Sequence, residues 1–600
     1  MSDDIGKSAT RRGGALGIWA LLLAMPVLVA GWAGDNDLVG GGNTLETIRI
    51  VALNDFHGNL APSGFSVPDP EDRARSIRIS AGGIEALGAV LAERRRADPE
   101  TIFVGAGDLI GASPLASSLL GDEPAIEALN ALGLQASAIG NHELDAGRGE
   151  LMRMQNGGCD SNAAERACRF SPRFSGAKFK YLAANIIDES TGKPAFPAYF
   201  VTSVRGIQVA FIGAVLRDTP RMLMPASSAG LRFLDEAESI NRVVPELRAR
   251  GIEAIVVLIH QGGETPEGFD QVDCKNLSGD IVEIVKKLDR AIDAVVSGHT
   301  HRGYQCRVEG RLVTQAASYG HLLTAVNLKV DRSTRDVVAA ESANIVVNAD
   351  LHAGRGDPAL TSLLARARAM TEPIANRPVG VIGVEQLANI ANTDGESPLG
   401  RVIADAQLHA TKHLGARIAL MNPGGIRTRL PANLPNPSKG VTYGDVLSVH
   451  PFGNTLTVIE LSGEELKSLL EQQWGKNSAR ARLLQVSRGF SYAYDPTLPQ
   501  GGRVDAASLH LDGVPIRPSD RIKVTVNNFL AGGGDGYGIL KDAAPHANTE
   551  ILDARALIDF LVERESRGEP AGSPSGERRL VRINIARSDP VARADEYHTH

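Results

Sequence analysis

Residues 136–145, Ala-Ser-Ala-Ile-Gly-Asn-His-Glu-Leu-Asp, decide the fold because an apolar run passes directly into polar residues. The apolar part predicts a β-strand that ends before Gly140, and α/β sheets place their ligands at such strand ends. Asn141 offers an amide oxygen to a metal, His142 can act as an acid or a cation, and Asp145 can orient His142. An isolated Asn-His pair is more often a turn, so the meaning of this stretch depends on the rest of the chain.

Polar residues follow four further apolar runs in the same way. Residues 47–53, 101–104, 252–259 and 294–296 have the composition of strands. They are followed by Asp55, His57, Asp108, His260, His299 and His301. Helical periodicity between the strands predicts an α/β domain. With Asn141, seven potential ligands fall at the same end of successive strands, which predicts a functional site.

This mixture of side chains predicts a metal centre. Carboxylate, imidazole and amide ligands suit Zn, Mn, Co or Fe better than Ca or Mg alone. Seven ligands exceed what one tetrahedral ion uses. They suit two divalent ions about 3.5–4 Å apart that share a bridging carboxylate and clamp a phosphate.

A second domain follows a predicted helical connector at residues 357–377, in which Leu360, Leu363, Leu364 and Ala367 have helical spacing. The loop 422–427 has the sequence Asn-Pro-Gly-Gly-Ile-Arg. It places two glycines before a guanidinium that can form two parallel hydrogen bonds with a phosphate or a carboxylate. Phe452 and Phe529 lie in turn-rich loops. Two such rings can sandwich a flat base, each stack contributing about 1–3 kcal/mol; ordinary core packing of both rings is an equal alternative.

Length and composition limit the function classes. With 600 residues, 43% of them hydrophobic and 22% charged, the chain is typical of a globular protein with two sizeable domains. A net charge of −7 argues against a nucleic-acid polymer as the partner, because phosphate backbones require a basic face.

The N-terminus has the features of an export signal. Arg11 and Arg12 precede an apolar run at residues 15–30, and small residues follow it at 31–33. A signal peptide over residues 1–33 predicts a periplasmic or secreted protein, and an uncleaved N-terminal anchor is the alternative. No other stretch approaches the roughly 20 apolar residues of a membrane helix, so no membrane contact is expected beyond this segment.

The four cysteines, Cys159, Cys168, Cys274 and Cys306, are an even number in a chain predicted to be exported. They therefore predict two disulfides, for which three connectivities exist. The two local pairings, Cys159–Cys168 and Cys274–Cys306, are favoured.

Taken together, the motifs Asp-x-His, Gly-Asp, Gly-Asn-His-Glu, His and Gly-His-x-His resemble the calcineurin-like metallophosphoesterase superfamily. With the second-domain loops, the chain is similar over residues 46–563 to the bacterial 5′-nucleotidase/UDP-sugar hydrolase family. The resemblance implies an α/β fold with an N-terminal four-layer α/β/β/α metallophosphoesterase domain and a separate C-terminal α/β substrate-binding domain. The expected boundaries are residues 46–350 for the first domain, 351–378 for a helical linker, 379–563 for the second domain and 564–600 for a flexible tail.

The resemblance also assigns roles to the residues of the first domain. One metal would be bound by Asp55, His57, Asp108 and His301, and the other by Asp108, Asn141, His260 and His299, with Asp108 bridging. His142 would donate to the phosphoryl oxygens in the transition state, and Asp145 would fix its tautomer. The alternative is that His142 merely caps the next helix. Glu143 receives no chemical role.

In the second domain, the resemblance implies that Phe452 and Phe529 stack the base and that Asp535 binds the ribose hydroxyls. Further substrate contacts match the family's Asn-Gly-Gly-Gly-Ile-Arg motif at Asn422, Gly425 and Arg427. Pro423 departs from the usual glycine, which restricts the backbone but keeps the register. Arg401 matches a phosphate-facing arginine in some members.

The implied function is release of phosphate from nucleoside 5′-monophosphates by attack of a metal-bound water. UDP-sugars and nucleoside di- or triphosphates are plausible further substrates. A 2′,3′-cyclic-nucleotide phosphodiesterase/3′-nucleotidase is the enzymatic alternative. From another class, the chain could be a catalytically inactive nucleotide-binding or adhesion protein. The sequence leaves monomer and dimer open.

Overall fold

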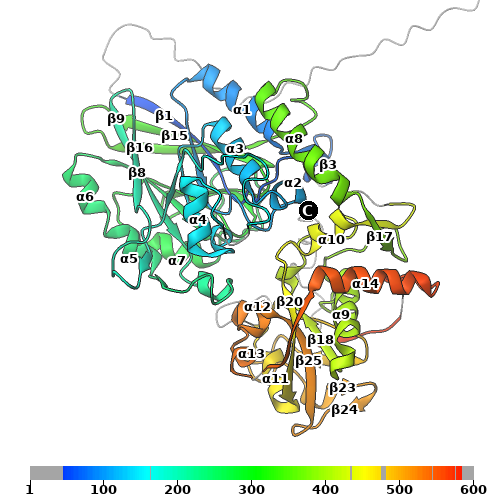
Figure 1. Ribbon diagram of the computed structural model, residues 1–600. Helices are drawn as coiled ribbons and strands as arrows, with labels where there is room; N and C mark the ends of the chain where they lie inside the picture. Colours follow the sequence, from blue (N-terminus) through cyan, green and yellow to red (C-terminus); the bar gives the residue numbers. More distant parts are fainter. Residues whose placement is uncertain are drawn as a thin grey trace, which may run out of the picture. The chain divides into compact units, whose positions relative to one another are not determined.

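The computed structural model describes residues 45–583 except 74, 162–163, 433–435, 475–480, 544 and 575 (Figure 1). The predicted signal peptide at residues 1–33 and the end of the predicted tail, residues 584–600, lie outside the described residues. Among the residues that are described, no helix combines the length and the apolar composition needed to cross a membrane.

Two six-stranded sheets form the centre of the first domain. The first sheet has the order β16-β15-β1-β4-β5-β6. Its strands are β16 (Val337–Val346), β15 (Leu322–Asp331), β1 (Leu45–Leu53), β4 (Ile102–Ala106), β5 (Ala136–Ala138) and β6 (Lys180–Leu182). The second sheet has the order β13-β14-β12-β11-β9-β8. Its strands are β13 (Gly303–Val308), β14 (Arg311–Ala316), β12 (Ala294–Ser297), β11 (Ala254–His260), β9 (Ile207–Val215) and β8 (Tyr199–Val204).

The central strands of both sheets are parallel. In the first sheet, β1 pairs with β4, β4 with β5, and β5 with β6 in parallel. In the second sheet, β9, β11, β12 and β14 are parallel neighbours. Strands buried on both faces have continuous apolar sequences, which is why residues such as 254–259 (Ala-Ile-Val-Val-Leu-Ile) form them.

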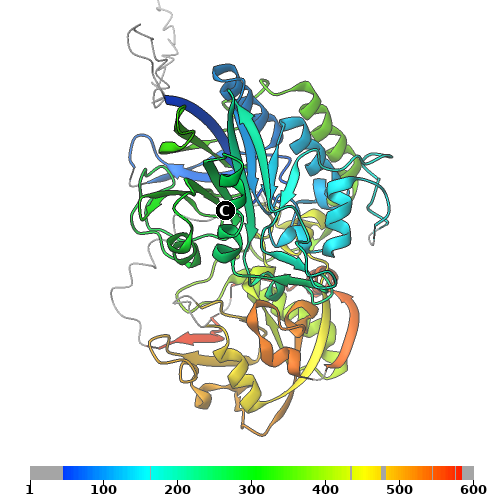
Figure 2. The ribbon, with the colours of Figure 1, turned by 90° about the vertical axis from the view of Figure 1, so that its left-hand side faces the viewer.

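Helices cover the outer faces of these sheets, which gives the four-layer α/β/β/α arrangement expected from the resemblance. Ile50, Val104, Phe211 and Val256 belong to an apolar core that both sheets share. The outer face of the first sheet carries a core with α1 (Ile84–Ala97), α3 (Glu123–Leu132) and α4 (Gly147–Asn156), and that of the second carries a core with α5 (Glu236–Asn241), α6 (Val244–Ala249) and α7 (Asp280–Lys287). Figure 1 shows α1 and α3 at one side of this domain and α5, α6 and α7 at the other, and Figure 2 shows it turned.

Helix α8 (Pro358–Ala375) corresponds to the predicted connector. The Asp357 carboxylate caps it by accepting a hydrogen bond from the Ala359 N–H at 2.8 Å. Leu360, Leu364 and Ala367 are buried in the same core as α1 and α3. The connector therefore also completes the helical layer of the first domain.

The second domain contains a mixed five-stranded sheet of order β21-β18-β25-β20-β26. Its strands are β21 (Gln485–Val486), β18 (Ile418–Met421), β25 (Arg521–Asn527), β20 (Thr455–Ser462) and β26 (Pro545–Leu552). The accompanying helices are α9 (Pro398–Thr411), α10 (Tyr443–Val449), α11 (Gly463–Glu471), α12 (Asn528–Ala531), α13 (Gly538–Asp542) and α14 (Asp553–Ser566). Ser462 and Glu465 form a capping box at the start of α11, and Thr442 and Asp445 form one at α10.

Smaller sheets complete both domains. The first domain has the hairpin β2 (Ser63–Pro68) and β3 (Ser76–Ala81) and the pair β7 (Ile186–Asp188) and β10 (Leu231–Phe233), with the short helix α2 (Leu115–Ser118). The second domain has the pair β17 (Pro378–Val381) and β19 (Gly440–Thr442). It also has a four-stranded sheet of β24 (Val514–Pro515), β23 (His510–Leu511), β22 (Phe490–Tyr494) and β27 (Leu580–Arg582).

The predicted flexible tail was placed too early in the chain. Helix α14 continues to Ser566, and β27 pairs in parallel with β22. The Arg579 side chain is only 2% exposed and forms hydrogen bonds with the Asp405 carboxylate at 2.8 and 2.9 Å. Strand β27, at residues 580–582, and the ion pair of the buried Arg579 side chain thus attach this segment to the second domain.

Both favoured disulfides are present. Cys159 is bonded to Cys168, and Cys274 is bonded to Cys306. In the segment around the first pair, Phe170 and Phe174 are buried in the core of the first domain. This segment therefore contributes to the helical layer as well as to the surface.

Candidate active site

The seven predicted metal ligands come together at the carboxyl ends of parallel strands. Asp55 and His57 follow β1, Asp108 follows β4, and Asn141 follows β5. His260 ends β11, while His299 and His301 follow β12. Parallel strands deliver their carboxyl ends to one edge, so residues up to 246 positions apart (from 55 to 301) meet there. Five of the seven side chains are buried, and His299 and His301 are half-buried.

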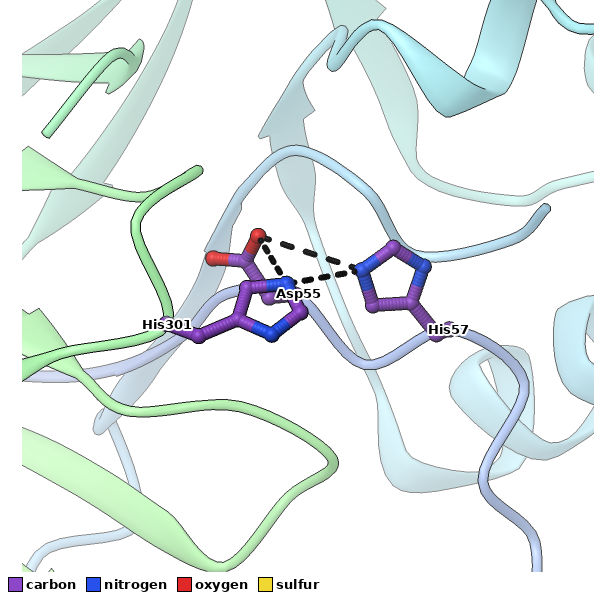
Figure 3. A group of neighbouring side chains, drawn as sticks. All are labelled: Asp55, His57 and His301. Atoms are coloured by element: carbon purple, nitrogen blue, oxygen red, sulfur yellow. Dashed lines mark hydrogen bonds and ion pairs between the residues drawn. The ribbon is translucent and has the colours of Figure 1, made fainter. Parts of the chain in front are cut away.

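Among the residues that the structure describes, potential ligand atoms lie within reach of a single ion in three overlapping groups. Each group has its nitrogen and oxygen atoms within 4.8 Å of one another. They are Asp55 with His57 and His301; His57 with Asp108 and His142; and Asp108 with His260 and His299. In the first group, shown in Figure 3, His301 Nε2 lies 3.3 Å from Asp55 Oδ1 and 3.1 Å from His57 Nε2. Asp108 is shared by the other two groups, as a bridging ligand would be.

Backbone carbonyls fix the tautomers of two of these histidines. His57 Nδ1 lies 2.8 Å from the Gly111 carbonyl oxygen, and His260 Nδ1 lies 2.8 Å from that of Ala106. A carbonyl only accepts, so each Nδ1 carries a proton, and Nε2 is the ring nitrogen that turns inward toward the other ligands. This is the arrangement by which proteins orient metal-binding histidines.

The electrostatics of the centre favour positive charge. His260 Nε2 lies 3.0 Å from Asp108 Oδ2, so two acceptor atoms face each other unless a proton or a cation lies between them. Burial lowers the pKa of His260, but the Asp108 carboxylate outweighs it and raises the pKa to about 10. Buried carboxylates, imidazole lone pairs and the Asn141 amide oxygen, 3.1 Å from His299 Nδ1, form a donor set that fits divalent cations of the Zn, Mn, Co or Fe kind.

Left-handed backbone conformations distinguish this centre from an ordinary sheet edge. Five of the seven residues have positive φ angles: Asp55 (49°), His57 (47°), Asp108 (50°), His299 (75°) and His301 (56°). Non-glycine residues rarely adopt this region, at a cost of about 1–3 kcal/mol each, and they persist where surrounding structure holds them. Such strain concentrates at functional sites, because it aims side chains that a regular strand would direct elsewhere.

His142 faces this centre and is held from two sides. Its Nδ1 lies 2.8 Å from Asp145 Oδ2, and its backbone N–H donates to Asp108 Oδ1 at 2.9 Å. Burial lowers the pKa of His142, but Asp145 and then Asp108 raise it above the ordinary value. The alternative role as a helix cap is wrong, because α4 begins at Gly147 and its N-cap residue is Ala146 without a side-chain cap.

Glu143, for which no chemical role was predicted, is buried beneath the centre and 3% exposed. Its carboxylate accepts hydrogen bonds from the backbone N–H groups of Asp108 at 2.9 Å, Leu109 at 2.7 Å and Gly140 at 2.6 Å. Burial and the Asp108 carboxylate raise the pKa of Glu143 to about 7. Only the three-dimensional approach of the two loops shows these contacts; the motif itself carries no signal for them.

A cavity of about 540 Å³ opens beside the metal ligands. Its lining includes Asn141, His142, Asp145 and His299 from the first domain. It also includes six of the predicted substrate residues, which are Asn422, Gly425, Arg427, Phe452, Phe529 and Asp535. The structure therefore brings the predicted metal centre and most of the predicted substrate residues to one cavity.

Asp535 and Asn422 form a polar cluster in the wall of this cavity. Asn422 Nδ2 donates to Asp535 Oδ2 at 2.8 Å, and Asn527 Nδ2 donates to Asn422 Oδ1 at 3.1 Å. Arg482 Nη1 lies 3.5 Å from Asp535 Oδ1. Arg482 lines the cavity but was missed, because a single arginine outside any motif gives no sequence signal.

The aromatic residues occupy different positions in the wall. The Phe452 ring stacks on His142, with 5.6 Å between centroids and 15° between planes, and the Arg427 guanidinium lies 5.8 Å from its centroid. Phe529 is half-buried and packs against the core of the second domain. Phe452 therefore connects its loop in the second domain directly with His142, the candidate transition-state residue.

Arg401 is the one predicted substrate residue that the structure places away from this cavity. It belongs to α9, and its Nη2 lies 3.5 Å from Glu577 Oε2. The predicted contact with phosphate rested on the match to family members that have an arginine at this position. Instead, residues 577–579, from the segment expected to be flexible, lie against this face of α9.

Residues 48–303 match the model of the calcineurin-like phosphoesterase family, and residues 377–542 match that of the 5′-nucleotidase C-terminal domain. The chain is 33% identical over 485 residues to Endonuclease YhcR of Bacillus subtilis, covering 81% of this chain and 37% of that relative. It thus spans little more than a third of that protein's length. It is 30% identical over 544 residues to the cell wall protein Lmo0130 of Listeria monocytogenes, covering 87% of this chain and 68% of that relative.

Among solved structures, the chain is similar to a 5′-nucleotidase precursor from Thermus thermophilus. The two are 27% identical with a TM-score of 0.69, and the match covers 90% of this chain and all of the other (100%).

Proposed function

Because this chain belongs to the 5′-nucleotidase family, in which a calcineurin-like phosphoesterase domain precedes a 5′-nucleotidase C-terminal domain, we propose that it hydrolyses nucleoside 5′-monophosphates to nucleosides and inorganic phosphate. One observation carries the proposal. The cavity of about 540 Å³ is lined both by His142 beside the metal ligands and by Arg427, Phe452 and Asp535 of the second domain. A nucleoside monophosphate has the corresponding parts, which are a phosphate group for the metal centre and a ribose and a base for the residues of the second domain.

The first domain, residues 46–350, supplies the reaction centre in this proposal. Two divalent ions of the Zn, Mn, Co or Fe kind would be held by the seven ligands, with Asp108 shared between them. When bound, they would supply positive charge for the phosphoryl oxygens and activate water for in-line attack. Asp55 and Asp108 offset that charge, and the carbonyls of Gly111 and Ala106 keep His57 and His260 in the tautomer that can ligate.

His142 stabilises the charge that develops on the phosphoryl group. With Nδ1 bonded to Asp145, its Nε2 is the atom left to donate toward the cavity. The raised pKa of His142 favours the imidazolium, which carries both a proton and a positive charge. The proposal requires no covalent intermediate.

The second domain, residues 379–563, selects the nucleoside. Asp535 offers carboxylate oxygens to ribose hydroxyls, and Asn422 holds it in place at 2.8 Å. Arg427 reaches toward the phosphate, and Phe452 and Phe529 present aromatic surface to the base. Since Phe452 stacks on His142, the base takes up its position as this ring contact opens. UDP-sugars and nucleoside di- or triphosphates share the parts that this cavity would recognise.

Residues 1–33 direct export in this proposal, so the mature protein works in the periplasm or outside the cell. The two disulfides support it, because such bonds persist in oxidising compartments.

A phosphate-release panel tests the proposed function. Purified protein is incubated with AMP, 3′-AMP, 2′,3′-cyclic AMP, ATP and UDP-glucose, each with Mn²⁺, Co²⁺, Zn²⁺ or a chelator. We expect phosphate from AMP with at least one metal and none with the chelator. Faster turnover of 3′-AMP and the cyclic nucleotide would replace the proposal with a 3′-nucleotidase. Binding of AMP without phosphate release under any metal would instead indicate a nucleotide-binding protein.

A further inference from the structure

Glu143 connects the two loops that carry the proposed ligands Asp108 and Asn141. One carboxylate oxygen, Oε2, accepts from the backbone N–H groups of Asp108 at 2.9 Å and Gly140 at 2.6 Å. The other, Oε1, accepts from Leu109 at 2.7 Å and from Ile110 at 3.4 Å. Four backbone donors from two separate strand ends thus converge on one side chain.

The loop after β4 needs such support because its backbone adopts left-handed conformations. Asp108 has a φ of 50° and follows Gly107, whose φ is 85°. The backbone N–H groups of residues 108–110 consequently point the same way and form a concave donor surface of the kind that binds anions. The Glu143 carboxylate occupies that surface from below, while the Asp108 side chain points to the other ligands.

The contacts of Glu143 exclude a direct part in proton transfer. Both carboxylate oxygens are engaged by backbone N–H groups, and the residue is 3% exposed. His142, its neighbour in sequence, has its own partner in Asp145. What Glu143 controls is the position of the backbone from which Asp108 and Asn141 extend.

We propose that Glu143 is a positioning residue that sets the spacing of the dinuclear centre by holding the Asp108 and Asn141 loops together. The inference rests on the metal centre of the proposed function and adds a residue outside the ligand set. Loss of the clamp lets the left-handed turn at Asp108 relax, and the shared carboxylate then no longer reaches both ions. Residues that orient ligands in this way typically contribute about 10- to 100-fold to metal affinity or activity.

The variant Glu143→Gln tests the clamp with little change of shape. Its amide has one acceptor oxygen, so its NH₂ group faces two of the four backbone donors and cannot bind them. Glu127→Gln is the matched control, because this residue lies on α3 of the same domain and pairs with the Arg366 side chain at 3.3 Å. Both proteins are loaded with Mn²⁺ and compared with the unmodified chain by electron paramagnetic resonance and metal analysis.

We expect the unmodified chain and Glu127→Gln to show the spectrum of two exchange-coupled Mn²⁺ ions. Glu143→Gln should show isolated Mn²⁺, bind the second ion about tenfold or more weakly, and lose about tenfold or more in kcat with little change in KM. A coupled spectrum and two equally tight ions in Glu143→Gln would overturn the proposal. The spectroscopic readout stands even if AMP is not the substrate.

Two further measurements cover a variant that fails to fold. Glu143→Asp keeps the charge but shortens the side chain, so it should reach only one loop and give a partly uncoupled spectrum; full coupling would contradict the clamp. Hydrogen exchange of the unmodified chain needs no variant and no metal. The amides of residues 108, 109 and 140 should exchange slowly even with a chelator present, and rapid exchange there would also overturn the proposal.

Discussion

At the residue scale, the centre depends on side chains whose protonation and direction are fixed by backbone contacts. The His57 and His260 rings are set by carbonyl groups, and Asp108 is aimed by a left-handed turn. His142 differs, because its partner is the Asp145 carboxylate, which favours a positive ring. The first two rings suit ligands, and His142 suits a proton donor.

Replacement of His142 by Ala should lower the kcat for AMP by about 100-fold or more, because a donor to the phosphoryl oxygens is lost. Metal content, measured on the same samples, should stay unchanged, since His142 is absent from the proposed ligand set. His413→Ala is the control, because this exposed residue lies outside the cavity. Equal turnover of His142→Ala and the unmodified chain would refute the role.

Replacement of Phe452 by Ala should weaken nucleotide binding by about 1–3 kcal/mol, which corresponds to an increase in KM of roughly 5- to 150-fold. Hydrolysis of p-nitrophenyl phosphate, which has no nucleoside, provides the control and should keep its KM. If KM rises equally for both substrates, Phe452 acts by supporting His142 rather than by contacting the base.

The Asp293 carboxylate should make stability depend on pH. It accepts a hydrogen bond from the Ile255 N–H at 2.8 Å, and burial raises its pKa to about 8. A raised carboxyl pKa means that the folded state binds more protons than the unfolded state, so stability falls as pH rises from about 4 to 8. Asp293→Asn should therefore gain about 1–2 kcal/mol relative to the unmodified chain between pH 5 and pH 8, a value discounted for partial exposure. Urea unfolding of both proteins at pH 5 and pH 8 measures this gain in stability. The assignment is refuted if the stability of Asp293→Asn relative to the unmodified chain is the same at both pH values or falls from pH 5 to pH 8.

At the scale of single elements, the sequence predicts the central strands and the helices around them, because parallel strands buried on both faces have continuous apolar runs. It does not predict β13–β16. Of these, β16 is an edge strand whose residues are mostly half-buried or exposed, so it lacks a continuous buried apolar run. It also misses the two-residue strands β21 and β24, which are too short to show a period; β21 pairs with the distant β18, and β24 pairs with the adjacent β23.

In the candidate site, too, some features were predictable from the sequence and others were not. The metal ligands were predictable because each one directly follows an apolar strand, so strand direction alone places them at one edge. The role of Glu143 and the position of Arg401 were not predictable. Glu143 acts through backbone donors of another loop, and Arg401 is held by Glu577, which comes from a segment without apolar periodicity.

Helix α4 is anchored by a buried charge. The Arg153 side chain is 4% exposed and lies 2.8 Å from a Glu123 oxygen and 2.7 Å from a Glu150 oxygen. Arg153→Met should lower the free energy of unfolding by about 3–5 kcal/mol, because Glu123 is left buried without a counter-charge. Arg96→Met, at an exposed pair 4.0 Å apart, should change it by less than about 0.5 kcal/mol. Similar effects of the two substitutions in denaturant unfolding would contradict this account.

At the scale of the whole molecule, the cavity unites residues from positions 110 to 535 of the sequence. The first domain contributes His142 and two of the proposed metal ligands, Asn141 and His299, and the second contributes aromatic, amide, guanidinium and carboxylate groups. Neither part contains both sets. In the proposed function, substrate choice and chemistry are therefore encoded in different stretches of one chain.

Chelation should destabilise the two domains unequally. The first domain holds the buried carboxylates of Asp55 and Asp108, and bound cations stabilise a folded state by about 2.7 kcal/mol at 100 times Kd. Calorimetry with and without EDTA should show a lower midpoint for the first domain and an unchanged one for the second. Domain-specific fluorescence or limited proteolysis assigns the transitions, and equal shifts would refute a metal centre confined to the first domain.

The parallel order of the strands that carry the ligands also sets when the centre can form during folding. Asp55, Asp108 and His301 meet only after β1, β4 and β12 have found their places in two different sheets. Contacts over such sequence distances carry a large loop-closure cost, so they form slowly and late. A divalent ion in the refolding buffer therefore has no complete binding site on the early chain, and it slows unfolding of the finished domain more than it accelerates folding.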